Sequence, residues 1–179
     1  MALSYERRHL SFTGFQTRPG GAENLVGVPR IIFDDPTDHA FAAPGPTTLV
    51  TIPIPAGSLR IAGDFFEYVA EYTLQGVGNS KTITYSFGGV NLNAAPWNNT
   101  LSSTQLVLIG RVYRLTSTTC RCYIAASLPF LGQANPFTQF GDITVANMDN
   151  NSLNFVVSVA AVANDDVIHK VSHMFIIQN

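Results

Sequence analysis

Charged side chains are scarce in this sequence. Ten basic and twelve acidic residues make up 12% of its 179 residues, about half the usual share of a soluble domain. The net charge of −2 at pH 7 does not favour general nucleic-acid binding, which needs an excess of positive charge. Because 46% of the residues are apolar, we expect some apolar surface to be covered by other chains. The alternative is a large, well-filled core that buries these side chains within the domain.

Long apolar runs are absent as well. The longest run, at residues 159–163, is far shorter than the ~18 residues that a membrane-spanning helix needs. Residues 1–10 contain Glu6, Arg7 and Arg8, and no apolar run of the kind found in signal peptides follows them. We therefore expect a protein that is made and folded in a cytoplasm and has no membrane partner.

The chain has only two cysteines, Cys120 and Cys122, which lie two residues apart. On a strand both side chains point to the same face, and a disulfide between them would strain the backbone. A zinc site, the alternative, would need about two further ligands. We interpret the pair as small, reduced residues that face the core, and we expect no metal or cofactor.

Common catalytic motifs are missing: there is no Gly-x-Ser-x-Gly, no phosphate-binding loop and no His-Glu-x-x-His. His169 and His173 are expected on one strand face, about 13 Å apart, which is too far for one metal ion. Glu67 and Glu71 have the same separation, beyond the ~5–9 Å of a glycosidase pair. We therefore expect a protein that is not an enzyme, although a dispersed Ser-His-Asp triad or a calcium site at residues 164–166 stays an alternative.

Prolines and glycines mark the turns of one stretch near the middle of the chain. Pro53 and Pro55 lack N–H groups, so their segment is expected at the edge of a sheet rather than in its middle. Gly57 and Gly63 indicate turns that require a positive φ angle. Gly88, followed by a second glycine, indicates a bend or bulge.

The strongest strand pattern lies between these turns. Residues 65–74 alternate in the manner of a half-buried strand, and residues 82–87 alternate again after a turn at residues 76–79. Two strands joined in this way predict a hairpin. The apolar face of the first strand consists of Phe66, Tyr68, Ala70, Tyr72 and Leu74.

About eight strands and no helix are expected in all. This pattern predicts an all-β fold, an antiparallel two-layer β-sandwich of jelly-roll-like type. Residues 128–142 are expected to form a long loop. The further strands are expected at residues 30–33, 90–93, 105–115, 118–127, 142–147, 153–161 and 167–177.

The first 46 residues differ from the rest, because they lack clear periodicity and yet carry scattered aromatic residues. We interpret residues 1–46 as an extended N-terminal arm that packs on a neighbour or along its own domain, and residues 47–179 as the sandwich domain. A frayed terminus is the alternative. Aromatic residues of the arm and the loops are the candidates for interactions: Tyr5, Phe12, Phe15, Trp97, Phe130, Phe137 and Phe140.

Two isolated positive charges, Lys81 and Arg111, lie on expected strands. We expect each of them to pair with Glu67 or Glu71 across a sheet, a contact worth well under ~1 kcal/mol if it is exposed.

One set of short motifs carries a family resemblance over residues 48–114. The arrangement resembles a sandwich module that recurs in structural proteins of tailed bacteriophages. The matching positions are Ile54-Pro55-Ala56-Gly57-Ser58-Leu59, Gly63-Asp64, Asn79, Lys81-Thr82 and Phe87-Gly88-Gly89, followed by Trp97 and Arg111.

The resemblance implies a non-enzymatic virion protein: a capsid decoration, a fibre, or a tail or baseplate component. It also implies a homo-oligomer, with a trimer favoured, that contacts capsid or tail subunits. The alternative is a receptor- or glycan-binding module at a fibre or tail tip. In that case Trp97, Tyr113 and the loop of residues 130–140 would stack on sugar rings.

Overall fold

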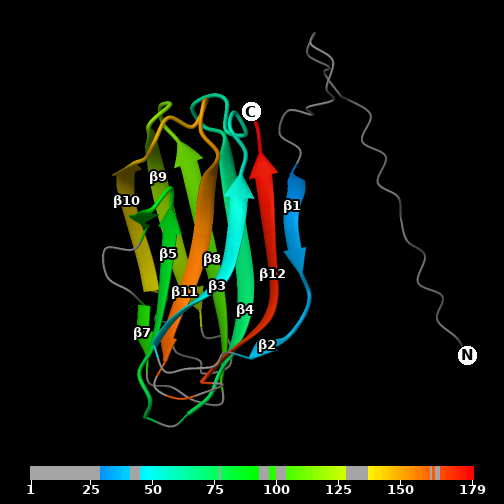
Figure 1. Ribbon diagram of the computed structural model, residues 1–179, viewed down its shortest axis with the longest axis vertical. Helices are drawn as coiled ribbons and strands as arrows, with labels where there is room; N and C mark the ends of the chain where they lie inside the picture. Colours follow the sequence, from blue (N-terminus) through cyan, green and yellow to red (C-terminus); the bar gives the residue numbers. More distant parts are fainter. Residues whose placement is uncertain are drawn as a thin grey trace, which may run out of the picture.

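The chain folds into two antiparallel β-sheets that pack face to face, which confirms the predicted all-β, two-layer sandwich (Figure 1). This computed structural model describes residues 29–40, 45–76, 78–92, 97–99, 104–127, 137–161, 163 and 166–179. These residues include no helix, and therefore none that could cross a membrane.

The larger sheet has seven strands, with the two-residue β2 (His39–Ala40) pairing beside β1 on the same edge of β12. The order across it is β1 (Arg30–Asp35), β12 (Val167–Ile177), β4 (Phe65–Leu74), β8 (Thr104–Arg114), β9 (Thr119–Ser127) and β10 (Phe137–Thr144). The smaller sheet has five strands, in the order β3 (Gly45–Ile54), β11 (Leu153–Ala161), β5 (Lys81–Phe87) and β6 (Val90–Asn91), with β7 (Trp97–Asn99) also paired to β5.

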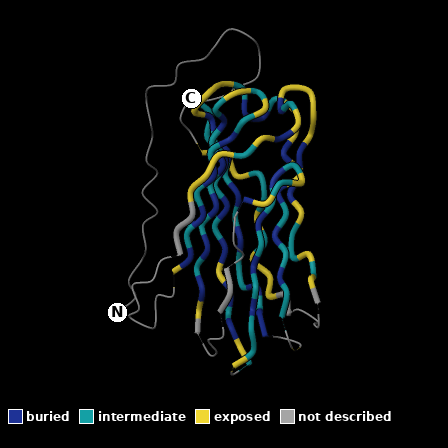
Figure 2. Tube along the Cα trace, turned by 90° about the vertical axis from the view of Figure 1, so that its left-hand side faces the viewer, coloured by how far each residue is buried: buried dark blue, intermediate teal, exposed yellow. Residues whose placement is uncertain are grey.

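The core lies between the sheets, and every second residue of the central strands β4 and β5 is buried (Figure 2). At its centre the fully buried ring of Phe155 lies 5.5 Å from Phe66, 5.1 Å from Tyr68 and 5.9 Å from Tyr85, measured between ring centroids. Buried aromatic side chains of this size remove much apolar area from water, so this cluster is a main source of stability.

The predicted hairpin of residues 65–74 and 82–87 is wrong. Both strands form, but β4 belongs to the larger sheet and β5 to the smaller one, so their connection passes from one sheet to the other. The last two strands, β11 and β12, also lie in different sheets. Alternation with period 2 shows which side of a strand is buried, but it does not show to which neighbour the strand is hydrogen-bonded.

The expectation that His169 and His173 share one face is also wrong. A β-bulge between His169 and Val171 shifts the register of β12 against β4 and reverses the alternation. His169 is therefore buried, and its Nδ1 lies 3.1 Å from the carbonyl oxygen of Thr37. His173 points outward and pairs with Asp34 of β1 at 2.8 Å.

Strand β10 begins at Phe137, not at residue 142, so the second part of the expected loop is a strand. Trp97, also expected in a loop, lies in the short strand β7. On the N-terminal side, β1 confirms the strand expected at residues 30–33 and pairs with β12. Residues 1–28 lie outside the described part of the chain, and the division at residue 47 stays a prediction.

The turn residues of the stretch that carries the resemblance have clear structural roles. Gly57 and Gly63 have φ angles of 70° and 94°, as expected. The carboxylate of Asp64 is fully buried and accepts hydrogen bonds from the backbone N–H groups of Arg60 at 2.7 Å, Ile61 at 3.2 Å and Asn179 at 2.8 Å. Asp64 thus joins the turn before β4 to the segment after β12.

A second group of polar contacts, which we name the Asp166 clamp, joins the β4–β5 connection to the β11–β12 connection, two of the connections that cross between the sheets. The Asp166 carboxylate accepts hydrogen bonds from Asn79 Nδ2 at 3.1 and 3.2 Å, and its carbonyl accepts one from Gln75 N at 2.7 Å. Lys81 Nζ donates to the carbonyl oxygens of Gly76 and Asn79, at 2.8 Å each. Burial lowers the pKa of Lys81, and the nearby Asp166 carboxylate partly offsets that effect.

The two isolated cations therefore differ in their partners. Arg111 pairs with Glu67 of the adjacent strand β4, as expected. Lys81 does not pair with Glu67 or Glu71, and that prediction is wrong. Since β5 lies in the opposite sheet from β4, its first side chain points into the interior, where backbone carbonyl oxygens bind the ammonium group.

Both cysteines are free thiols buried on the inner face of β9, which confirms their interpretation as reduced core residues. Burial raises the pKa of the Cys120 and Cys122 thiols to about 12 from an ordinary value of 9.0. The unfolded chain loses these protons near pH 9, whereas the folded chain keeps them until about pH 12. The two thiols thus favour folding below pH 9, and this contribution is lost as the pH rises toward 12.

We expect Cys120 and Cys122 of the native protein to resist alkylation by iodoacetamide at pH 8.5, because the reactive species is the thiolate. The measurement is the mass shift over time by mass spectrometry. The control is the same protein in urea, where both thiols should react fully. Native alkylation at the rate of the unfolded chain would contradict the buried placement.

Candidate functional site

The outer face of the larger sheet carries an ordered array of aromatic and charged side chains across β4, β8, β9 and β10. The strand register places them in two rows that run from strand to strand. The first row is Glu67, Arg111, Tyr123 and Phe140, and the second is Phe65, Tyr113, Arg121 and Asp142. Directly opposed side chains of this kind are close enough to interact.

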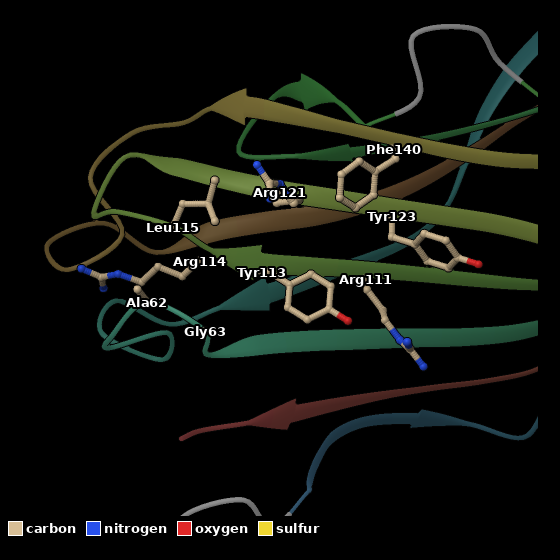
Figure 3. Close-up of a pocket in the computed structure, with 9 residues that line it drawn as sticks. All are labelled: Ala62, Gly63, Arg111, Tyr113, Arg114, Leu115, Arg121, Tyr123 and Phe140. Atoms are coloured by element: carbon tan, nitrogen blue, oxygen red, sulfur yellow. The ribbon is translucent and has the colours of Figure 1, made fainter.

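Five side chains from these rows line a groove of about 470 Å³ (Figure 3). Arg111, Tyr113, Arg121, Tyr123 and Phe140 line it from the sheet face. Ala62 and Gly63, from the turn before β4, and Leu115, just after β8, line it at one end. The groove is therefore built mostly on strands, which hold side chains in more precise positions than loops do.

Ring contacts hold the aromatic side chains of the groove in place. The ring of Tyr113 lies 4.8 Å from that of Phe65, tilted by 33°. The guanidinium of Arg121 lies 5.3 Å from the centroid of the Phe140 ring, within the range of a cation–π contact. Phe140 is 63% exposed, which is unusual for a large apolar side chain on a strand and marks this part of the face as open to a partner.

Each arginine of the groove is paired with a carboxylate. Arg111 bonds to Glu67, and Arg121 bonds to Asp142 through Nε at 2.8 Å and Nη2 at 3.0 Å. The hydrogen bond from Arg121 lowers the pKa of Asp142. Arg114, at the end of the groove, is held by Asp149 at 2.5 Å. The groove therefore combines many charged groups with little net charge.

Of the seven aromatic residues selected from the sequence, the structure places Phe140 in the groove. Trp97 and Phe137 lie in strands β7 and β10, whose backbone is described at these positions. The remaining four, Tyr5, Phe12, Phe15 and Phe130, lie outside the described residues.

Sequence reasoning missed Tyr123 and Arg121 as site residues. The signal was present, because the pattern Arg-x-Tyr occurs at residues 111–113 and again at residues 121–123. In two neighbouring antiparallel strands this spacing places both pairs on one face, with each tyrosine opposite an arginine. The described residues contain no group of three His, Cys, Asp or Glu side chains that could hold a metal ion.

No family model matches the chain, and no curated protein is significantly similar to it. Among solved structures, it is similar to the CBM2 module of the evolved Dit protein of Lactobacillus casei BL23 phage J-1, with 8% identity over 70% of this chain and 67% of that chain and a TM-score of 0.35. A protein of unknown function from Shewanella oneidensis MR-1 is 8% identical over 78% of both chains, with a TM-score of 0.32.

The infectious bursal disease virus VP2 subviral particle is 13% identical over 94% of this chain and 46% of that chain, with a TM-score of 0.25. At TM-scores of 0.35 or lower, none of these structures assigns a function to the chain.

Proposed function

We propose that this chain is a non-enzymatic structural protein of a virus particle, of the tailed-bacteriophage kind, located in the virion as a capsid decoration or tail component. It assembles with further copies of itself, with three copies as the expected number, and with capsid or tail subunits. The virion location rests on the resemblance of residues 48–114, and the observation that carries assembly is the edge strand β10.

The other edges of the two sheets have features that discourage pairing with another chain. Strand β1 carries charged residues and a bulge between Ile31 and Phe33, and β6 is two residues long. Strand β3 contains Pro46 and Pro53, which cannot donate to a further strand. These are devices by which proteins avoid association at sheet edges.

Strand β10 has fewer of these features. Its eight residues pair with β9 in continuous register and contain no proline. Its single charged residue, Asp142, is engaged by Arg121 on the adjacent strand. Within the described residues β10 pairs only with β9, and we propose that its other edge receives a strand of a neighbouring subunit.

Two further features support a scaffold role. The low charge of the chain suits a protein whose surface is partly covered in an assembly. In addition, three polar residues of the resemblance motifs make internal structural contacts. Asp64 and Lys81 bind backbone groups, and Asn79 binds the Asp166 carboxylate. The aromatic residues Tyr5, Phe12 and Phe15 make the N-terminal arm a second proposed contact.

The test is the mass of the purified full chain by light scattering over a range of concentrations. We expect an oligomer, and we expect Gly141→Lys to shift it toward the monomer, because a lysine on an edge strand opposes further pairing. A Cβ at Gly141 would meet no heavy atom within 4 Å, so the fold should tolerate the change.

The matched control is Thr51→Lys, which puts the same charge on an exposed position of the edge strand β3 and should leave the mass unchanged. A monomeric wild type at every concentration would refute self-association. An oligomer whose mass is unchanged by Gly141→Lys would refute the role of β10.

A further inference from the structure

We propose that the groove on the outer face of the larger sheet binds the pyranose ring of an uncharged carbohydrate. The C–H face of the sugar ring lies on the aromatic rings of Tyr113, Tyr123 and Phe140. Its hydroxyl groups exchange hydrogen bonds with the two arginine–carboxylate pairs. This binding function goes beyond assembly through β10 and does not depend on it.

The aromatic groups of the groove offer what a sugar ring needs for stacking. Tyr123 and Phe140 are direct neighbours across β9 and β10, and Tyr113 lies on the adjacent strand β8 (Figure 3). All three side chains line the groove, and Phe140 is the most exposed large apolar side chain of the described residues. The Phe65 ring packs against Tyr113, and the Arg121 guanidinium packs against Phe140. These contacts limit the movement of Tyr113 and Phe140, so the two side chains lose little conformational entropy when a ligand binds.

The two arginine–carboxylate pairs lie beside these rings on the same face of the sheet, with both arginines lining the groove. Arg121 and Asp142 form a two-bond pair and yet remain 43% and 45% exposed, so a ligand can reach both. A pair of this kind presents a donor and an acceptor side by side, which matches two neighbouring hydroxyl groups. Arg111, paired with Glu67 and 40% exposed, offers the same arrangement on the other row.

Charge and size favour an uncharged sugar over other occupants. Each guanidinium of the groove already has a carboxylate partner, so an acidic ligand would have to compete with Glu67 and Asp142. The volume of about 470 Å³ lies within the ~300–1,000 Å³ of small-molecule sites. Pairing at the edge of β10 uses backbone groups, whereas the groove uses side chains of the sheet face, so a subunit contact and a bound sugar can coexist.

The test is a titration of the isotope-labelled full chain, followed by amide resonances in NMR spectra. The probes are the methyl pyranosides of glucose, galactose, mannose and N-acetylglucosamine, with methyl glucuronide as the anionic comparison. We expect at least one neutral sugar to bind with a Kd of about 1 mM. The saturable shifts should fall at residues 111–113, 121–123 and 140–142.

We expect Tyr123→Ala to weaken the binding of that sugar about tenfold, because the variant lacks one stacking ring. Tyr123→Phe keeps the ring and should retain most of the affinity, so it also guards against a folding defect of the alanine variant. The matched control is Phe175→Ala, on β12 of the same sheet but outside the groove, which should leave the affinity unchanged.

Three results would overturn the proposal: no saturable shift at the groove with any neutral sugar, tighter binding of the glucuronide, or equal effects of the Tyr123 and Phe175 alanine variants. A fourth is a change of oligomer mass in Tyr123→Ala with no bound sugar, which would identify the face as a subunit contact. None of these results bears on Gly141→Lys, so this inference and the proposed function can fail separately.

Discussion

Replacing Asp166 by alanine is expected to lower the free energy of unfolding by about 3–5 kcal/mol. The side chain is 2% exposed, and its carboxylate accepts hydrogen bonds from Asn79 Nδ2 and from the backbone N–H of Ala163. It is also the negative charge that faces the buried Lys81. Without it, the two donors lose their acceptor, and the fully buried ammonium group of Lys81 loses the nearby negative charge.

The measurement is equilibrium unfolding in urea, read as the shift of the midpoint at constant slope. The matched control is Asp142→Ala, which removes another paired carboxylate from the surface and should hardly move the midpoint. Lys81→Met in the Asp166→Ala background should restore part of the lost stability, because it removes the uncompensated charge. Equal midpoints for the Asp166 and Asp142 variants would show that the clamp does not hold the sheets together.

Replacing Asp64 by alanine is expected to lower the free energy of unfolding by about 2–4 kcal/mol, the second large effect. The variant leaves three backbone N–H groups, those of Arg60, Ile61 and Asn179, without the acceptor that the fully buried Asp64 carboxylate provides. We expect the structure to open first at this place, because these hydrogen bonds connect the turn before β4 with the segment after β12.

Amide hydrogen exchange is the sensitive measurement for the Asp64 variants. In Asp64→Ala, residues 60–61 and 178–179 should exchange faster than the centre of β12, in addition to the shift of the urea midpoint. Asp64→Asn keeps one acceptor oxygen and should lose about half as much stability. Unchanged exchange at Asn179 would mean that Asp64 does not hold the end of β12.

The sequence predicted the parts of the fold that depend on the burial of single strands. The alternation of residues 65–74 matches β4, and the inward positions Phe66, Tyr68 and Tyr72 are all buried. The edge placement of Pro53 was also correct, because a residue without an N–H group has few other positions in a sheet. Such features follow from the local chain and need no knowledge of its neighbours.

What could not be predicted depends on contacts between distant residues. The segment after β4 has the glycines of a hairpin turn, yet it crosses to the other sheet. Lys81 and Asp166 meet there from positions far apart in the sequence. The bulge between His169 and Val171 contains no glycine or proline, so the sequence carries no signal for it. For the groove, the Arg-x-Tyr pattern was visible, but its rows exist only through the register of four strands.

The strand order has a consequence for synthesis of the protein. The last two strands, β11 and β12, occupy interior positions: β11 lies between β3 and β5, and β12 lies between β1 and β4. A nascent chain that ends before residue 153 therefore lacks an inner strand of each layer and cannot close either one. Since the contacts that close the layers are long-range, we expect folding to wait until the ribosome has released residues 153–177. Until then the apolar faces of β4 and β5 have no complete partner sheet, and we expect the partly made chain to be prone to aggregation.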